Sequence, residues 1–432
     1  MTWTNWAGNE SARLARRSTP RSEAEVALLI QRAASDGLAV KAVGAGHSFT
    51  RVAATGGVQV CLDALTGVTE VDPSRGEVTV RAGTPLHVLN EELGILGLAL
   101  PNLGDIDRQT IAGATSTGTH GTGLRLTGLA AGIRALRIVL ADGTAVSCSP
   151  THEPELFEAA RLGLGALGIV TELTLAVVPA YLLQAHERPE RMSELLERVD
   201  VEFEAHDHFE FYWFPHTDRA LSKRNNRVPA GTEREPLPAW RARLDDDLLS
   251  NRLFELTNRL ATAAPRTTRT INAIAGRALS ERRYTDHSHR VFVTDRDVRF
   301  VESEWAFPRR SLGDVLRELR SWIDRHGERI SFPVECRVAA PDDVWLSTAY
   351  ERESCYVAIH RYARQPRGGY FEAFERIAME HGGRPHWGKV HTRDAQWLQA
   401  AYPRFDDFRR VRDRVDPDRR FGNAYLCQVL GS

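Results

Sequence analysis

The sequence predicts an α+β protein built from many short elements, and three observations support that prediction. Asp142 and Gly143 stand between two strand-like runs, which is typical of a hairpin turn. A GxGxxG string, residues 163–168, follows a predicted helix (155–161) and precedes a predicted strand (169–177). A dinucleotide-binding fold requires the opposite order, so a Rossmann site is excluded. At roughly 150 residues per domain, the 432 residues indicate two or three domains.

Two early helices are predicted from the signals at their ends. Residues 22–25 read Ser-Glu-Ala-Glu, a capping-box pattern, and open an apolar helix that ends at Gly37. Thr84 and Pro85 form a good N-cap and first helical position for a helix that closes at Gly94. Runs of apolar residues predict strands at 39–43, 58–62 and 78–82, the last two with one buried face.

The amino-acid composition changes after Pro179, so we place a domain boundary near residue 180. Aromatic residues and Arg become more frequent, and residues 209–214 predict a strand. A polar, Pro- and Arg-rich stretch from Asn225 to Asp247 predicts a surface excursion. Amphipathic spacing predicts helices that begin at Ser311 and near Tyr370.

Composition narrows the class of protein. The 56 basic and 57 acidic residues give a net charge of −1, so the chain is not a general binder of nucleic-acid backbones. Five Cys without a CxxC pair argue against a disulfide framework or structural zinc and fit the cytoplasm. The first residues lack a secretory signal, and no transmembrane segment is predicted; peripheral membrane contact and the oligomeric state stay open.

Two His pairs have a spacing that could bind metal on a strand. They are His206 with His208 and His287 with His289. Neither pair has a third ligand at a recognisable distance along the chain. Packing or surface roles are therefore favoured, and no metal is predicted.

Two Gly-rich loops predict a cofactor site. The first is Val43-Gly44-Ala45-Gly46-His47-Ser48, in which two glycines let the backbone turn sharply and present N–H groups to phosphate oxygens. The second spans residues 104–121 and offers small residues, hydroxyls and amides but little apolar bulk. Either loop alone would read as an ordinary turn. Together they indicate an extended cofactor that lies across loop backbones.

These loops carry a family resemblance. GAGHS followed by TIAGATSTGTHGTG resembles the flavin domain of the vanillyl-alcohol-oxidase-type (PCMH-type) FAD oxidoreductases, and within them the aldonolactone oxidoreductases and their alditol-oxidase relatives. Pro333-Val334-Glu335-Cys336-Arg337 resembles the ExR strand of that group, and Arg384–Lys389 its HWGK motif. The resemblance implies a two-subdomain FAD-binding domain (1–180), an α+β substrate or cap domain with an antiparallel sheet (181–385), and a C-terminal segment (386–432) that returns to the flavin.

The resemblance also implies which residues contact FAD. His47 stands where members with this pattern link an imidazole nitrogen to the flavin 8α-methyl group, so a covalent 8α-histidyl link is expected. Residues 44–48 would hold the pyrophosphate and ribityl region, and Gly168 to Val170 the adenine end. The expected FAD-binding residues are Val43, Gly44, Ala45, Gly46, His47, Ser48, Gly104, Asp105, Thr110, Gly113, Ser116, Thr117, Thr119, His120, Gly121, Gly168, Ile169, Val170, His386 and Lys389.

Glu335 and Arg337 are two residues apart on a predicted strand, so their side chains share a face. A plain ion pair would explain them, but the resemblance assigns them to the substrate hydroxyls. Glu335 would bind or deprotonate the hydroxyl, and Arg337 would stabilise the developing negative charge. Lys389 would supply a second positive charge; these three are the expected catalytic residues. Substrate contacts are expected from the same three and from Asp105 and His360.

The implied activity is FAD-dependent oxidation of a CH–OH group, with an aldono-1,4-lactone of the gulono-, galactono- or arabinono-type as substrate. Hydride would pass to flavin N5, and O2 would be reduced to H2O2. Gly104 leaves room for O2 where some members carry the bulkier Ala, which favours an oxidase. Alditol oxidation, a dehydrogenase with another electron acceptor and, more distantly, a non-catalytic flavin- or sugar-binding protein are the alternatives.

Overall fold

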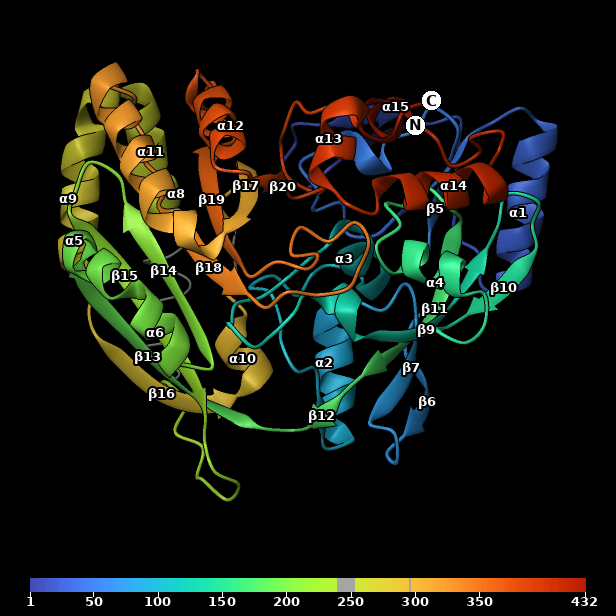
Figure 1. The fold of residues 1–432 in the computed structure, drawn as a ribbon, viewed down its shortest axis with the longest axis horizontal. Helices are drawn as coiled ribbons and strands as arrows, with labels where there is room; N and C mark the ends of the chain where they lie inside the picture. Colours follow the sequence, from blue (N-terminus) through green and yellow to red (C-terminus); the bar gives the residue numbers. More distant parts are fainter. Residues whose placement is uncertain (239–252, 295–296) are drawn as a thin grey trace.

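The computed structural model describes residues 1–238, 253–294 and 297–432 and has a mixed α+β architecture. Figure 1 shows two halves side by side, joined by the strand that leads from β12 into β13. The first half holds helices α1 (Glu23–Ser35), α2 (Leu86–Ile95), α3 (Ile111–Thr117) and α4 (Pro154–Arg161). Its strands are β1 (Thr2–Thr4), β2 (Ser11–Arg13), β3 (Arg16–Ser18), β4 (Val40–Val43), β5 (Val58–Cys61), β6 (Val68–Asp72), β7 (Glu77–Arg81), β8 (Leu98–Ala99), β9 (Ile133–Val139), β10 (Ala145–Cys148), β11 (Ile169–Ala176) and β12 (Val178–Pro179).

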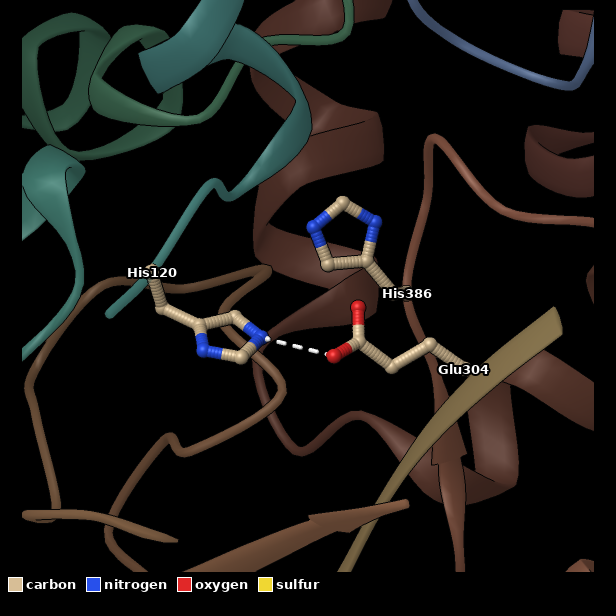
Figure 2. Close-up of side chains that lie close together, drawn as sticks. All are labelled: His120, Glu304 and His386. Carbon is tan, nitrogen blue, oxygen red and sulfur yellow. Dashed lines mark ion pairs between the residues drawn. The ribbon is translucent and has the colours of Figure 1, made fainter. Parts of the chain in front are cut away.

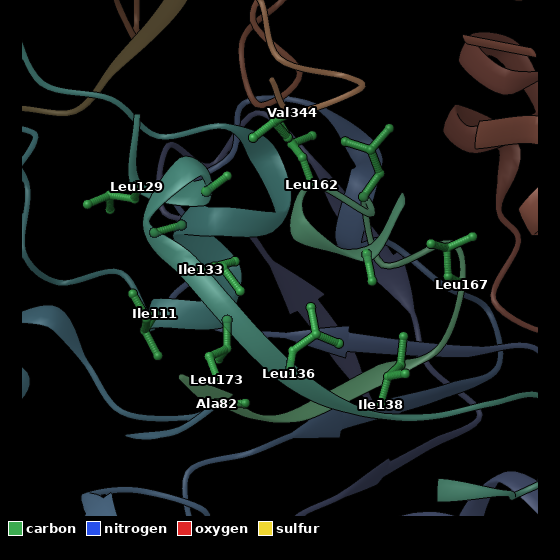
Figure 3. Close-up of a cluster of buried hydrophobic side chains, with 14 of the residues drawn as sticks. Ala82, Ile111, Leu129, Ile133, Leu136, Ile138, Leu162, Leu167, Leu173 and Val344 are labelled. Atoms are coloured by element: carbon green, nitrogen blue, oxygen red, sulfur yellow. The ribbon is translucent and has the colours of Figure 1, made fainter. Parts of the chain in front are cut away.

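Two sheets organise the first half. The parallel sheet β3-β5-β4 carries the loop that follows Val43, and the antiparallel sheet β10-β9-β11-β7-β6 lies beside it. Asp142 and Gly143 turn β9 into β10, as predicted, with Ala145 opposite Val139. Residues 163–168 connect helix α4 to strand β11, which confirms that they are not a Rossmann turn. Figure 3 shows apolar side chains that fill the core of this half, among them Ala82 and Leu173. Val344 of the second half packs in the same cluster.

The second half is an eight-stranded antiparallel sheet in the order β16-β13-β15-β14-β18-β19-β17-β20. The antiparallel sheet expected for this region is therefore confirmed. Its strands are β13 (Leu182–Arg191), β14 (His208–Phe214), β15 (Arg219–Arg227), β16 (Arg282–His287), β17 (Phe300–Pro308), β18 (Val334–Ala339), β19 (Ser354–Tyr362) and β20 (Arg384–Pro385). The accompanying helices are α5 (Met192–Glu197), α6 (Val199–Ala205), α8 (Leu253–Ala263), α9 (Thr268–Ala278), α10 (Ser288–Phe292), α11 (Leu312–His326) and α12 (Tyr370–Glu380).

The two faces of this sheet differ in chemistry. Helix α11 buries one apolar stripe, including Leu316, Leu319 and Ile323, in a core shared with Phe211 of β14 and Val334 of β18. Alternate residues of the same strands face the other way and include the charged Glu210, Glu335 and Arg337. An amphipathic strand normally turns its polar face to water, whereas here both faces are covered. The charged face therefore lines an interior site.

The chain ends on the first half, where α13 (Ala395–Ala401), α14 (Phe405–Val415) and α15 (Ala424–Leu430) lie above the early strands in Figure 1. Phe408, Phe421 and Leu426 belong to the same apolar core as Val26 and Ile30 of α1. The Asn423 side chain donates to the carbonyls of residues 51, 52 and 54, and the backbone N–H of Val40 donates to Arg420.

One local prediction about the first half is confirmed and two are corrected. Helix α1 begins as predicted, with Ser22 Oγ accepting from the Glu25 N–H. The prediction for Thr84 was wrong: helix α2 begins at Leu86, because Thr84 Oγ1 donates to the Arg81 carbonyl and accepts from the Gly67 N–H. Strand β5 is buried on both faces rather than one, since it is the central strand of its sheet.

The predicted surface excursion begins later than expected. Asn225 is buried in strand β15, and the continuously exposed stretch runs from Pro229 to Pro236. Residues 239–247 of that prediction lie outside the described residues. No helix in the described part of the chain is long and apolar enough to cross a membrane.

Candidate functional site

Two cavities meet at His47. The first runs between the early strands and the loop after helix α4, with an empty volume of about 1080 Å³ that is partly open to solvent. The second cavity lies against the charged face of the large sheet. Both cavities are lined by His47, Ser48, Gln109 and Thr117, which mark their junction.

The loop after β4 presents backbone donors to the first cleft. Gly46 adopts a φ of +71°, a conformation that an L side chain rarely takes, and this turns the chain at the end of the strand. In the part of the chain that the structure describes, no protein acceptor receives the backbone N–H groups of residues 45–48. Consecutive free N–H groups in a turn form an anion-binding nest. The loop is fixed by the Trp6 N–H, which donates to the Gly46 carbonyl, and by the Phe49 N–H, which donates to Gly388.

Most of the expected FAD-binding residues line one of the two cavities. Residues 43–48, Thr110, Gly113, Ser116, Thr117, Gly168 and Val170 line the first, and Gly104, Asp105, Thr119, His120, His386 and Lys389 line the second. Gly121 and Ile169 line neither. A Cβ on Gly121 would stand 2.2 Å from the Leu103 carbonyl oxygen, and Ile169 is buried in the apolar core. Packing within the protein therefore accounts for both.

His47 is held as a neutral imidazole. Its ring stacks on Trp6 with a centroid separation of 5.2 Å and an interplanar angle of 24°. Burial, followed by the positive charges of Lys389, Arg299 and Arg108, lowers the pKa of His47 to about 4. At neutral pH the ring therefore keeps a nitrogen lone pair, which is the form that acts as a nucleophile.

The second cavity concentrates charge. Glu302 and Glu304 of β17, Glu335 and Arg337 of β18, and His360 of β19 reach it from adjacent strands. Asp105, His120, His386 and Lys389 reach it from loops, as do Phe49, Gly104 and Ile106. The structure therefore brings together all the side chains that the sequence predicted for catalysis and substrate binding. A small cavity with several carboxylates and two fixed cations suits a ligand rich in hydroxyl groups.

Arg337 is clamped by three carboxylates. Its Nε donates to Glu210 at 2.9 Å, and its Nη2 contacts Asp105 at 3.5 Å and pairs with Glu335. Burial alone would lower the pKa of Arg337, but Glu335, Glu210 and Asp105 raise it well above its usual value. The guanidinium is thus a permanent charge in a fixed orientation. Glu335 and Arg337 do share one face of β18, while Val334, Cys336 and Val338 pack in the apolar core.

Lys389 forms a second fixed charge. Its Nζ pairs with Glu302 and lies 5.2 Å from the centre of the Phe49 ring. Burial would lower the pKa of Lys389, but Glu302 and Glu304 raise it. The other oxygen of Glu302 lies 3.7 Å from His360 Nε2, so this carboxylate connects two residues that the sequence predicted separately.

His120, Glu304 and His386 form a buried cluster, shown in Figure 2. One ligand atom from each lies within 4.8 Å of the others, a separation that a metal ion could bridge. Both rings are engaged within the protein: His386 Nδ1 accepts from the Gly388 N–H at 3.0 Å, and His120 Nε2 pairs with Glu304 at 3.4 Å. Burial is the main reason why the pKa of His386 falls to about 3, so this ring is neutral.

The two His pairs considered for metal make contacts within the protein. His208 Nδ1 donates to the Thr122 carbonyl at 2.9 Å, and His206 contacts Asn226 and stacks near Phe209. His287 and His289 stack on each other at the start of helix α10 rather than along a strand.

Sequence reasoning missed Glu210, Glu302 and Glu304. Each stands in an alternating strand such as Phe300–Pro308, where a carboxylate reads as a solvent-facing residue. Their burial follows from the other half of the molecule covering that face. The signal that could have found them is the number of acids in strands that otherwise consist of large apolar residues.

Comparisons with known proteins agree with this geometry. Residues 15–149 match the FAD binding domain family, and residues 173–429 match the D-arabinono-1,4-lactone oxidase family. The chain is 41% identical to L-gulono-1,4-lactone dehydrogenase of Mycobacterium tuberculosis, covering 99% of each chain. It is 33% identical to L-gulonolactone oxidase of Scyliorhinus torazame, covering 98% of this chain and 96% of the relative.

A solved cholesterol oxidase from B. sterolicum superposes with a TM-score of 0.81 at 16% identity, covering 99% of this chain and 96% of the other, which is a likeness of fold alone. The family matches and the full-length relatives show more than the fold. The chain belongs to the aldonolactone oxidoreductase branch of the PCMH-type FAD oxidoreductases.

Proposed function

We propose that this protein binds FAD along the first cleft and oxidises the carbinol of an aldono-1,4-lactone in the second cavity. The observation that supports this most directly is the position of His47. It is shared by a cleft that offers backbone amides and by a cavity that offers acids and bases. A cofactor lying along the first cleft would expose its reactive ring to the second. The residues present fit FAD, because the N–H groups of residues 45–48, which have no acceptor among the described residues, can donate to its phosphates.

His47 is proposed to carry a covalent 8α-histidyl link to the flavin. The neutral ring, held against Trp6, supports that role because only the unprotonated nitrogen can form the bond. The link is tested by acid precipitation of the purified protein. A pellet that stays yellow in the wild type and is colourless in His47→Ala is expected. A colourless wild-type pellet would remove this part of the proposal.

Once bound, FAD supplies the acceptor for the hydride that leaves the substrate carbon. Arg337 binds the substrate oxygen and stabilises negative charge that develops on it, since its guanidinium is fixed and permanently charged. Glu335 receives the hydroxyl proton on a carboxylate oxygen. Lys389 and Asp105 bind the remaining hydroxyl or carbonyl oxygens. Both halves line the cavity, and Glu335 and Arg337 are buried, which strengthens their electrostatic interactions.

O2 is the proposed electron acceptor, with H2O2 as its product, because Gly104 leaves space beside the second cavity. A dehydrogenase using another acceptor is the main alternative, since the Mycobacterium tuberculosis relative is named as one. The chain is also 31% identical to alditol oxidase of a Streptomyces species, over 99% of its length, so an alditol is the alternative substrate.

Anaerobic mixing with a panel of aldonolactones and alditols tests the substrate. Bleaching of the flavin by a 1,4-lactone, and slower bleaching by alditols, is expected. Admitting air then tests the acceptor: rapid return of the yellow colour together with H2O2 supports an oxidase. Return only with an added dye would assign a dehydrogenase, and a flavin that no compound bleaches would favour a binding protein. We further propose a cytoplasmic location.

A further inference from the structure

A row of alternating charges crosses five strands of the large sheet and ends at Arg337. Arg282 of β16 stands directly opposite Glu187 of β13, and Glu187 is directly opposite Lys223 of β15. Lys223 is in turn opposite Glu210 of β14, and the β14–β18 register places Glu210 beside Arg337. Directly opposed residues share one face of a sheet, so the five side chains form one continuous row.

The contacts follow the register. Arg282 Nε donates to Glu187 at 2.9 Å, Lys223 Nζ lies 3.1 Å from Glu210 Oε1, and Arg337 Nε donates to Glu210 Oε2 at 2.9 Å. Glu187, Lys223, Glu210 and Arg337 are all buried, with at most 7% of each residue exposed. Burying four charges in one row is expensive unless each is compensated by its neighbours.

Lysine is rare in this chain, and Lys223 is one of few. Only three lysines occur among 56 Lys and Arg residues, namely Lys41, Lys223 and Lys389. Lys41 lines the first cleft and Lys389 the second cavity. Arg therefore supplies almost every other cation, and the remaining lysine stands in the charged row rather than on the surface.

We propose that Lys223 and Glu210 are positioning residues for Arg337, which they reach along this row without contacting the substrate. The inference rests on the proposed function only for the role of Arg337 itself. Glu210 occupies Nε, so Nη2 is left to face Glu335 and Asp105, which both line the cavity. Lys223 compensates Glu210 from the other side. Without Lys223, Glu210 would attract the guanidinium more strongly and draw it away from the cavity.

The ionisation of the row is consistent with this role. Burial alone would raise the pKa of Glu210, but Lys223 and Arg337 lower it to about 2. Burial would lower the pKa of Lys223, but Glu210 and then Tyr212 and Glu187 raise it. Glu210, Lys223 and Arg337 therefore all stay charged at neutral pH.

A double-mutant cycle tests the proposal through the rate of anaerobic flavin reduction by a lactone. Lys223→Met is expected to lower that rate by about 10- to 100-fold, because a displaced catalytic group loses its alignment. In an Arg337→Met background the same change should alter the rate by less than about twofold, since no guanidinium remains to be positioned. An equal factor in both backgrounds would overturn the proposal.

Arg224→Met is the matched control. Arg224 follows Lys223 on β15, is equally buried, and pairs with Glu190 and Glu202 on the opposite face of the sheet. It should destabilise the protein to thermal unfolding about as much as Lys223→Met does. A purely structural role for Lys223 predicts that the two variants lose the same fraction of the rate.

A second readout does not depend on turnover. Lysine labelled with ¹³C at Cε should give three NMR signals, assigned by replacing each lysine with Met. Arg337→Met and Glu210→Gln should both shift the Lys223 signal, and Arg224→Met should leave it in place. A Lys223 signal unmoved by Arg337→Met would overturn the coupling. This measurement still tests the row if no lactone reduces the flavin, an outcome that would instead refute the proposed function.

Discussion

Both ring nitrogens of His120 face oxygen atoms: Nδ1 lies 2.9 Å from the Gly121 carbonyl, and Nε2 lies 3.4 Å from Glu304 Oε1. A carbonyl oxygen only accepts, so Nδ1 donates to Gly121, while Nε2 faces a carboxylate oxygen of Glu304. Burial would raise the pKa of Glu304, but His120, Lys389 and His386 hold it well below its usual value. The ring also stacks on Tyr356, with centroids 3.7 Å apart.

Glu304→Gln should therefore remove the ionised partner of a buried pair and cost about 3–5 kcal/mol in the free energy of unfolding. Because the folded-state pKa of Glu304 is lowered, its contribution is present above the unfolded pKa of about 4.3 and is lost as the pH falls through the folded value. The gap between wild type and variant should narrow below about pH 4.3. Urea unfolding at several pH values measures this.

The control for that experiment is Glu375→Gln. Glu375 is a buried residue of helix α12 that pairs with Arg393, and it lines neither cavity. Adding His120→Asn should recover part of the loss caused by Glu304→Gln but none of the loss caused by Glu375→Gln. Additivity in both cases would mean that His120 and Glu304 do not act as a pair.

Lys41 should make the free energy of unfolding rise with pH above about pH 7. Its Nζ donates to the carbonyls of Gly165 at 2.9 Å and Phe421 at 3.2 Å, and burial is the main reason why its pKa falls to about 7. Between pH 7 and the unfolded value of about 10.4, the unfolded chain binds more protons than the folded one. The stability of the wild type should therefore rise relative to Lys41→Met, by up to about 1.4 kcal/mol per pH unit. A difference that stays flat from pH 7 to 9 in urea unfolding would contradict this.

Gly104→Ala should slow the reaction with O2. The added Cβ would lie 3.2 Å from the His120 carbonyl oxygen and 3.4 Å from Thr119 Cγ2, so it fits tightly and fills space beside the second cavity. We expect slower reoxidation by O2 and little change in anaerobic flavin reduction by a lactone. Stopped-flow measurement of both half-reactions distinguishes them. Equal slowing of the two would indicate a general distortion of the site.

Gly168→Ala should destabilise the protein whether or not FAD is bound. The new Cβ would stand 2.5 Å from the Val139 carbonyl oxygen and 2.7 Å from Ile138 Cγ1, and overpacking of this kind costs about 1–3 kcal/mol. Gly163→Ala is the control in the same turn, since its Cβ would meet nothing closer than 3.5 Å. Thermal unfolding of the flavin-free proteins provides the comparison. A Gly168→Ala defect that vanishes without FAD would mean that the glycine serves the cofactor instead.

Local signals predicted the elements well. The Ser22 cap and the Asp142-Gly143 turn depend on neighbouring residues, and both are present. Thr84 shows the limit: its hydroxyl is used by Gly67 and Arg81, two residues that a helix-start pattern does not include. The shared face of Glu335 and Arg337 was predictable because it follows from strand geometry alone.

The contacts that Arg337 makes with other strands were not predictable from local sequence. Glu210 meets Arg337 across 127 positions of the sequence, and Lys223 meets Glu210 only because β14 and β15 pair in one register. A shift of one residue in either pairing would turn these side chains to opposite faces. Strand register is a property of the whole sheet, so residues that depend on it escape any reading of single segments.

The hydrogen bonds from Lys41 to Phe421 and from Val40 to Arg420 should also influence the order of folding during biosynthesis. Domains commonly fold as they emerge from the ribosome, N-terminal part first. Here the hydrogen bonds of strand β4 to residues 420 and 421 can form only after those residues, almost 400 positions later, have been synthesised. During translation the nascent first half therefore stays open along one side, and a chaperone or the flavin itself would meet it in that state. Loading of the cofactor should accordingly follow synthesis of the C-terminal helices rather than accompany synthesis of the Gly-rich loops.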